Sequence, residues 1–303
     1  MTTHAIPSES NENLLLQHKI TIAPHPRVFG TDLTNLLPQQ KSSEIPKLSI
    51  YPNEYISDIV NHLHETEAEY LPKSGYMIIQ ESINEKMRNI LVDWLVEVHK
   101  KFKLVEETLF LTVNIIDRYL EKTQVVRENL QLVGVSSMLI ASKYEDIYPP
   151  EIKDFVNITD DTYTAQQVLE TEILILRCLN FNITTPSALR FLEQYAKMSE
   201  FDELALNFSR YLIELSLVEY KFLKYKPSNI SASAIYLTQK ALKNPSKSLK
   251  SLTTSTDIEI RTCAKDLITL FQKAETCTLQ AVKKKYSQPK YYEVAKLQIK
   301  FKF

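Results

Sequence analysis

The stretch MRNILVDWLVEVHKKF, residues 87–102, carries more apolar side chains than an ordinary surface helix needs. On a helical wheel of about 100° per residue, its apolar positions cover roughly 240°. A surface helix uses an apolar face only somewhat wider than about 100°. Either this helix is buried on nearly all sides, or it leaves part of its apolar surface open for a partner. The apolar positions are Met87, Ile90, Leu91, Val92, Trp94, Leu95, Val96, Val98 and Phe102.

Arg88 falls inside this apolar arc, whereas the polar wedge of the same helix holds Asn89, Asp93, Glu97 and Lys100. A charge among apolar neighbours is costly unless an opposite charge pairs with it. We therefore expect an acidic partner for Arg88 elsewhere in the chain.

Helical periodicity extends from about residue 50 to the end of this region. Residues 53–71 read as one amphipathic helix. Ser82 and Glu85 have the spacing of a capping box, which predicts that the 87–102 helix begins there. Five helices are expected in about 100 residues, namely the 87–102 helix, 106–122, 128–145, a short helix after Pro149-Pro150, and 164–181.

The helix over residues 128–145 has an unusual texture, because residues 132–142 carry no charge and mix large apolar with small side chains. Such a helix is typical of the centre of a helical domain. Residues 230–238 repeat this texture, and residues 204–215 loosely repeat 109–120. A repeat of this length predicts two similar helical domains in tandem, with Pro186 at the junction.

The expected fold is therefore all-α. We expect a disordered regulatory tail over residues 1–48, which are polar and contain five prolines. An N-terminal helix and linker occupy 49–81, and the two helical domains occupy 82–184 and 185–303.

Composition excludes several classes of function. Lys and Arg number 36 against 37 Asp and Glu, so no overall field attracts nucleic acid or a membrane surface. The cysteines, Cys178, Cys263 and Cys277, lack the spacing of a metal site, and their odd count suits a reducing compartment. We expect structural thiols, no metal, no cofactor and an intracellular protein without a membrane span.

No arrangement of residues predicts catalysis. The six histidines cluster early in the chain, and His62 and His64 are two apart, so they do not face each other on a helix. Glu145 and Asp146 are adjacent and point about 100° apart. The basic run at 282–286 is expected to be a solvated helix face. The sequence therefore favours a binding function over an enzyme.

One family resembles this sequence over a long stretch. The segments MRNILVDWLVEVHKKFKLVEETLFLTVNIIDRYL (87–120) and LQLVGVSSMLIASKYEDIYPPEIKDFVNITDDTYT (130–164) are similar to the cyclin box of A- and B-type mitotic cyclins. The likeness is unbroken from about residue 82 to 183 and continues more weakly to KKKYSQPKYYEVAKL (283–297). Local segments favour the A type, with the B type close behind.

The resemblance implies two five-helix cyclin folds in tandem after an N-terminal helix. It also implies a non-catalytic regulatory subunit that binds and activates a cyclin-dependent protein kinase, controls cell-cycle progression, and works in the nucleus and cytoplasm. Such a subunit holds the αC helix of the kinase inward, where the catalytic Lys–Glu ion pair forms. The alternative is a cyclin-fold adaptor in transcription that does not activate a kinase.

The resemblance also assigns individual residues. Five positions mark the cyclin box in this family, and all five match here, as Arg88, Asp117, Leu132, Lys143 and Glu172. Arg88 and Asp117 correspond to a buried structural ion pair. The residues that correspond to kinase-binding positions are Lys143, Glu172, Phe181, Ile183, Tyr55 and Ile59, with Asp146 as a weaker candidate.

A second implied surface is a shallow patch that docks Arg-x-Leu segments of substrates and inhibitors. An apolar groove receives the Leu, and an acid at its rim receives the Arg. We expect this docking patch to comprise Met87, Ile90, Leu91, Trp94, Glu97, Leu130 and Gln131. Leu91 is expected to be partly open, together with Met87, Ile90 and Trp94. Asn89 stands where the family usually has Ala, but it belongs to the polar wedge.

The N-terminal segment RVFGTDLTN, residues 27–35, resembles the destruction box that sends mitotic cyclins to a ubiquitin ligase. Arg27, Leu33 and Asn35 match, whereas Gly30 replaces the usual Leu. A degenerate box and a chance match both remain open for this segment.

Overall fold

The structure of the protein is a computed structural model that describes residues 55–242, 253–299 and 301. The expected tail over residues 1–48 and the destruction-box residues Arg27, Leu33 and Asn35 lie outside these residues. Within the described ranges, all regular secondary structure is helical, which confirms the all-α prediction. In the same ranges no helix has the length and apolarity needed to cross a membrane.

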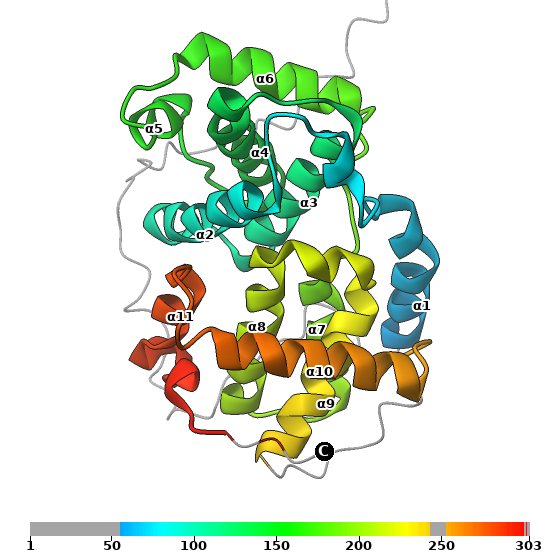
Figure 1. The fold of residues 1–303 in the computed structure, drawn as a ribbon. Coiled ribbons are helices and arrows are strands. Elements are labelled where there is room, and N and C mark those ends of the chain that lie inside the picture. Colours follow the sequence, from blue (N-terminus) through cyan, green and yellow to red (C-terminus); the bar gives the residue numbers. More distant parts are fainter. Residues whose placement is uncertain (1–54, 243–252, 300, 302–303) are drawn as a thin grey trace, which may run out of the picture. The chain divides into compact units, whose positions relative to one another are not determined.

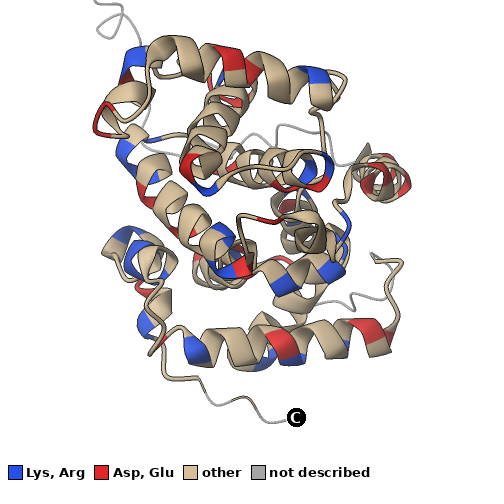
Figure 2. Cartoon of the chain, turned by 45° about the horizontal axis from the view of Figure 1, so that its top comes forward, with Lys and Arg blue, Asp and Glu red and all other residues tan. Residues whose placement is uncertain are grey.

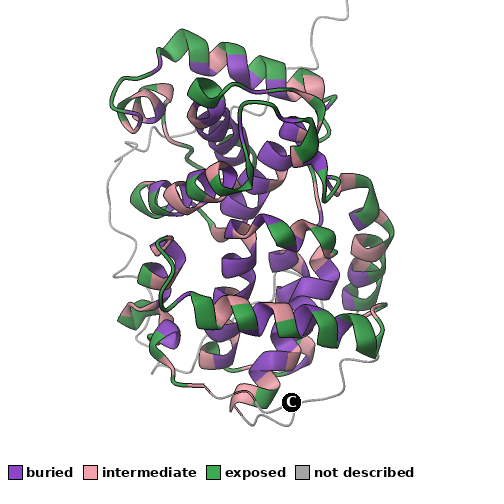
Figure 3. Cartoon of the chain, viewed as in Figure 1, coloured by how far each residue is buried: buried purple, intermediate pink, exposed green. Residues whose placement is uncertain are grey.

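The first half of the fold contains the five predicted helices: α2 (Glu85–Phe102), α3 (Glu106–Lys122), α4 (Leu130–Glu145), α5 (Ile152–Asn157) and α6 (Ala165–Cys178). Helix α4 packs against the other four (Figure 1). Every residue from 132 to 142 is buried, and α4 is coloured as buried along most of its length in Figure 3. The absence of charge in this segment therefore marks the central helix, as expected.

Gly134 shows how closely two helices approach in this core. A Cβ atom at Gly134 would lie only 2.8 Å from Leu91 Cδ1 of α2. The small residue in α4 therefore admits the Leu91 side chain, which is 6% exposed. An alanine at this position would force Leu91 to move.

The second half repeats the first with α7 (Ala188–Met198), α8 (Glu203–Val218), α9 (Pro227–Leu242), α10 (Asp257–Lys273) and α11 (Ala281–Tyr286). Helix α9 is central, because it packs against α7, α8 and α10 and is buried from residue 228 to 235. Helices α8 and α9 contain the segments that repeat α3 and α4 in sequence. The tandem arrangement is therefore confirmed.

The N-terminal helix is shorter than predicted. Helix α1 (Ile56–Thr66) gives way to a 3₁₀ turn, η3 (Glu67–Tyr70), instead of running to residue 71. This turn directs the buried Glu67 carboxylate to the start of α9, where it accepts hydrogen bonds from Ser228 N at 3.2 Å and Ser228 Oγ at 2.9 Å. Since a helix N-terminus has unsatisfied N–H groups, Glu67 anchors the N-terminal segment to the second half of the fold.

The predicted Ser82–Glu85 capping box is wrong. Helix α2 is capped by Asn84, whose Oδ1 accepts a hydrogen bond from Met87 N at 3.1 Å. Asn84 has extended backbone geometry directly before the first helical residue, and asparagine is among the strongest N-cap residues. The capping position is therefore two residues later than the spacing suggested.

Candidate functional site

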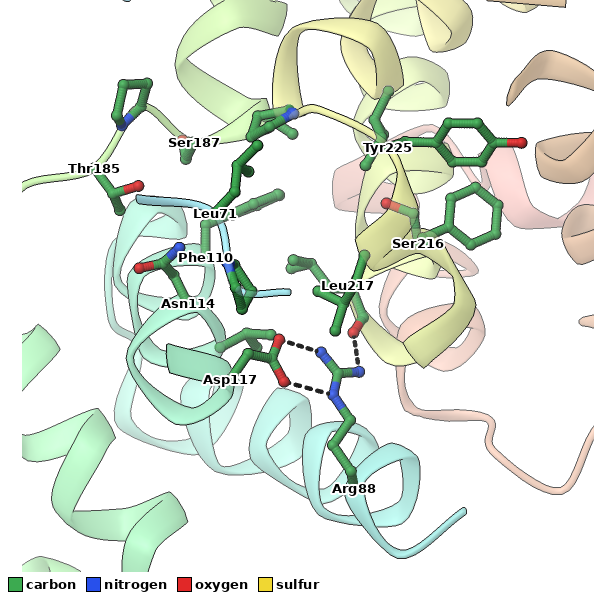
Figure 4. A pocket seen from close by; sticks show the side chains of 18 residues that line it. Leu71, Arg88, Phe110, Asn114, Asp117, Thr185, Ser187, Ser216, Leu217 and Tyr225 are labelled. Atoms are coloured by element: carbon green, nitrogen blue, oxygen red, sulfur yellow. Dashed lines mark hydrogen bonds and ion pairs between the residues drawn. The ribbon is translucent and has the colours of Figure 1, made fainter. Parts of the chain in front are cut away.

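The Arg88–Asp117 pair lies at the junction of the two helical halves (Figure 4). Arg88 Nε and Nη2 donate to the Asp117 carboxylate at 3.0 and 2.7 Å, and both side chains are 1% exposed. Arg88 Nη1 also donates to the carbonyl oxygens of Leu217 and Val218 at 2.6 and 3.0 Å. These carbonyls end α8, where a helix has unsatisfied acceptors. Arg88 therefore joins α2 to α3 and to the second half of the chain.

Burial alone opposes the charge on Arg88, but the neighbouring Asp117 raises the pKa of the guanidinium above its ordinary value. Tyr76 is the third member of this cluster, because its hydroxyl donates a hydrogen bond to Asp117 Oδ1 at 2.8 Å. Arg88 therefore stays charged and hydrogen-bonded inside the protein, as a structural ion pair requires.

A cavity of about 90 Å³ adjoins this pair and is lined by parts of α2, α3, α8, α9 and the segment between the two halves. Figure 4 shows Leu71, Phe110 and Leu217 among its walls. Sites for small molecules usually measure about 300–1,000 Å³. This cavity is too small to be a candidate ligand site.

Lys143 and Glu172 are brought together by the fold. Lys143 is in the last turn of α4, and its Nζ donates to both Glu172 oxygens, at 2.7 and 2.9 Å. The Lys143 side chain is 44% exposed and the Glu172 side chain 11% exposed. The pair is thus an accessible charge-assisted contact between α4 and α6, and each member holds the other in place.

The other residues expected to bind a kinase differ in exposure. Phe181 is 65% exposed and Tyr55 is 52% exposed. Ile59 and Ile183 are half-buried. Phe181 follows the end of α6 with a left-handed φ of 56°, held by a hydrogen bond from its N to Leu176 O at 2.8 Å. Large apolar side chains are thus presented to solvent at Phe181 and Tyr55.

Asp146 has a role within the fold that the sequence did not indicate. Its carboxylate accepts hydrogen bonds from Val105 N at 2.9 Å and from Thr108 Oγ1 at 2.6 Å. Val105 precedes α3 and has no side chain that can cap a helix. Asp146 therefore supplies the missing acceptor at this N-terminus from a distant part of the chain.

The predicted docking patch is only partly accessible. Ile90 is 48% exposed, Glu97 is exposed, and Met87, Trp94 and Gln131 are half-buried. Leu91 and Leu130 are buried, with exposures of 6% and 5%. The expectation that Leu91 is partly open is wrong, because the space above Gly134 admits its side chain. The accessible apolar part comprises Met87, Ile90 and Trp94.

The polar wedge of α2 faces the second half of the chain. Asn89 Oδ1 accepts from Tyr220 N at 3.1 Å, and Asp93 Oδ1 accepts from Ala281 N at 3.0 Å. Burial raises the pKa of the Asp93 carboxyl. Next along the wedge, Glu97 pairs with Lys284 of α11 at 3.6 Å. The wedge thus forms part of an interface between the two halves.

The expectation of a solvated face for residues 282–286 is wrong. Lys285 is 3% exposed, and its Nζ donates to Glu214 Oε1 at 2.5 Å. Tyr286 also donates to Glu214 Oε1, at 2.6 Å. Helix α11 packs between α2 and α8, so one of its three consecutive lysines must point inward.

The cysteines and acids give no sign of a metal site, since the described ranges contain no group of three or more His, Cys, Asp or Glu placed to bind one. Burial raises the pKa of the Cys263 thiol to about 12, so Cys263 is an inert core residue. Cys178 is half-buried and Cys277 is exposed.

Charged residues of both signs are scattered over the helices (Figure 2).

Comparison with known proteins places these features in one family. Residues 58–184 match the family described as "Cyclin, N-terminal domain", and residues 186–300 match "Cyclin, C-terminal domain". The chain is 44% identical to "G2/mitotic-specific cyclin-A" of Patella vulgata, with 80% of this chain and 58% of that protein covered. It is 43% identical to "G2/mitotic-specific cyclin-B" of Marthasterias glacialis, with 80% and 63% covered.

The fold also resembles solved structures. A viral cyclin from Herpesvirus saimiri matches with a TM-score of 0.63 and 22% identity, over 70% of this chain and 97% of that one. The chain spans about three fifths of the length of the two curated relatives named above. The family models and the sequence relatives together confirm the resemblance to mitotic cyclins, with the A and B types at nearly equal identity. The chain belongs to the cyclin family.

Proposed function

We propose that the protein is a non-catalytic regulatory subunit that binds a cyclin-dependent protein kinase and activates it during the cell cycle. The observation that carries this proposal is the accessible Lys143–Glu172 pair, at the two positions where the family grips its kinase. Exposed Phe181 and Tyr55 supply apolar surface at further positions of that interface. The relatives named as mitotic cyclins support the cell-cycle role.

The pair suits the peptide backbone near the start of the αC helix of a kinase. Lys143 offers N–H donors to carbonyl oxygens, and Glu172 offers acceptors to N–H groups. Opposite charges at a fixed separation define the direction and register of the bound segment as well as its affinity. Holding the αC helix inward completes the Lys–Glu ion pair of the kinase, and that step is the activation.

The test is a pull-down with the full chain, followed by a histone-type phosphorylation assay of the captured kinase. We expect a bound kinase whose activity rises when the chain is added. Capture of a kinase without activation favours the alternative, a cyclin-fold adaptor in transcription.

We further propose that Met87, Ile90 and Trp94, with Glu97 at the rim, dock Arg-x-Leu segments of substrates and inhibitors. Trp94 packs on the core but remains half-buried, and Ile90 is 48% exposed. An apolar shelf beside an acid is suited to a short peptide with one apolar and one basic anchor. The ubiquitin ligase suggested by Arg27, Leu33 and Asn35 stays a prediction, because those residues lie outside the described ranges.

Replacing Trp94 by Ala is expected to lower phosphorylation of Arg-x-Leu proteins about 30-fold or more, because a central aromatic anchor is worth about 2 kcal/mol or more. Activity on short peptides without the motif should not change. The measurement is kcat/KM for a matched pair of substrates with and without the motif. Ile90→Ser serves as a second variant with less risk to the core. An equal loss on both substrates would show damage to the fold instead of loss of docking.

Lys284 should weaken the docking of basic residues, since it pairs with Glu97 at 3.6 Å. Lys284→Ala is expected to raise affinity for Arg-x-Leu peptides about two- to fivefold, because an exposed pair is worth about 0–1 kcal/mol. The affinity for an Ala-x-Leu control peptide should stay unchanged. Fluorescence polarisation with both peptides makes the comparison. A weaker Arg-x-Leu complex would mean that Glu97 does not receive the Arg.

A further inference from the structure

A second and larger cavity, of about 400 Å³, opens where the N-terminal helix meets both cyclin folds. Its walls come from α1, η3, α3, the end of α4, the segment 184–186 and α7. The volume is within the range of small-molecule sites. The docking patch and the Arg88–Asp117 pair contribute nothing to its lining.

Three acceptor side chains contribute to the polar lining, beside the positively charged Arg190. Gln194 is 5% exposed, and its Oε1 has no hydrogen-bond partner in the described structure. Glu107 and Glu145 bring two carboxylates, with side chains 11% and 17% exposed. Arg190 lies 3.8 Å from Glu107 and 3.6 Å from Glu145, longer than the 2.7–2.9 Å of a direct charge-assisted hydrogen bond. The site therefore has acceptor capacity for one more donor group.

The rest of the lining indicates which donor fits. Ile59, Leu63 and Leu111 form an apolar wall, and Tyr70 and Tyr144 add aromatic rings. An aliphatic chain with a positive end matches this mixture, since cations are attracted to aromatic faces as well as to carboxylates. A metal ion does not, because the described residues hold no cluster of three metal-ligating side chains.

We propose that this cavity binds a small organic cation, an alkyl guanidinium or alkyl ammonium. Its charged end donates to Gln194 Oε1 and to the carboxylates of Glu107 and Glu145, and its alkyl part packs on the apolar wall. The occupant touches α1, α3 and α7 at once. Binding therefore links the N-terminal helix to both cyclin folds and slows the opening of α1.

The site also predicts a dependence on pH. Burial, together with Glu145 and Glu193, raises the pKa of Glu107 to about 7, while Ser187 and Arg190 act in the opposite direction. His62 faces the same cavity from α1. Because the cation prefers the deprotonated Glu107, affinity should rise about tenfold from pH 6 to pH 8. Glu107→Gln removes this titration and should flatten that rise.

The test is calorimetric titration of the kinase-free full chain with butylguanidine and with butylurea, its neutral isostere. We expect saturable one-to-one binding of butylguanidine, with Kd on the order of 1 mM or tighter, and no binding of butylurea. Glu145→Gln and Gln194→Leu should each weaken binding about tenfold. Glu128→Gln, before the opposite end of α4, should leave it unchanged, and circular dichroism checks the fold of each variant.

Hydrogen exchange of α1 supplies an independent readout, because a bound cation should slow exchange over residues 56–66. Equal heats for the two probes, no saturable butylguanidine signal, or affinity unaffected by both cavity variants would overturn the proposal. None of these outcomes depends on whether a kinase binds.

Discussion

Replacing both Lys143 and Glu172 by Ala is expected to lower kinase binding and activation about 100-fold or more. Each residue offers a charge-assisted contact to the kinase, and hydrogen bonds to charged groups are worth about 1.5–3 kcal/mol each. The two side chains also pair with each other at 2.7 Å in the free chain, so the double variant leaves no stranded charge. Pull-down and histone-type phosphorylation measure the effect.

The charge-exchanged variant Lys143→Glu with Glu172→Lys separates function from folding. It keeps an ion pair between α4 and α6, so the free energy of unfolding should stay near that of the parent chain. It reverses the charges presented to the kinase, so activation should be lost. Lys224→Ala with Asp266→Ala removes a comparable pair, at 2.7 Å on the second cyclin fold, and should leave activation intact. Undiminished phosphorylation in both Lys143/Glu172 variants would exclude this pair from the kinase interface.

The spacing of apolar and charged residues within short segments was sufficient to predict much of the fold. Helix α3 has the bounds that its periodicity predicted, 106–122, because apolar spacing and charged ends agree there. Helix α4 was identifiable as central because residues 132–142 lack charge. The same texture at 230–238 predicted the centre of the second fold. In each case the signal depends on residues close together in sequence, which is why one sequence reveals it.

Most of the wrong predictions concern side chains that pair with residues distant in the sequence. Lys285 belongs to a run that resembles a solvated face, and its inward orientation is stabilised by the buried Glu214, 71 positions earlier. Asn89 and Asp93 look like the outer face of a helix, yet their acceptors serve N–H groups of the second fold. Periodicity identifies a polar face but does not distinguish solvent from a polar interface.

The candidate site also combines residues that the sequence predicted with contacts that it did not. Arg88 was recognisable as misplaced because a charge inside an apolar arc needs a partner. Its additional donors to the end of α8 were not predictable, since backbone carbonyls have no sequence signature. The resemblance placed Leu91 in the open docking patch, and the close approach at Gly134 buries it instead. The division between core and docking surface therefore depends on helix separation, which the sequence does not specify.

Replacing Arg88 by Met is expected to lower the free energy of unfolding by about 3–5 kcal/mol, because Asp117 is left buried without its partner. A thermal midpoint lower by about 6–15 °C corresponds to this loss in a chain of this size. Urea and thermal unfolding of the full chain measure the two quantities. Lys153→Ala, which breaks an exposed pair with Glu151, is the control and should cost less than about 1 kcal/mol.

Double replacement, Arg88→Met with Asp117→Leu, shows which part of the cost belongs to the stranded charge. If the pair acted alone, an apolar pair of similar volume would restore most of the stability. Arg88 also donates to Leu217 and Val218, and Asp117 accepts from Tyr76, so restoration should be partial. The remaining loss should localise to the junction of the two folds, and hydrogen exchange should quicken over residues 217–225 while α5 and α6 keep their protection. Uniformly faster exchange would contradict a role for Arg88 in joining the two cyclin folds.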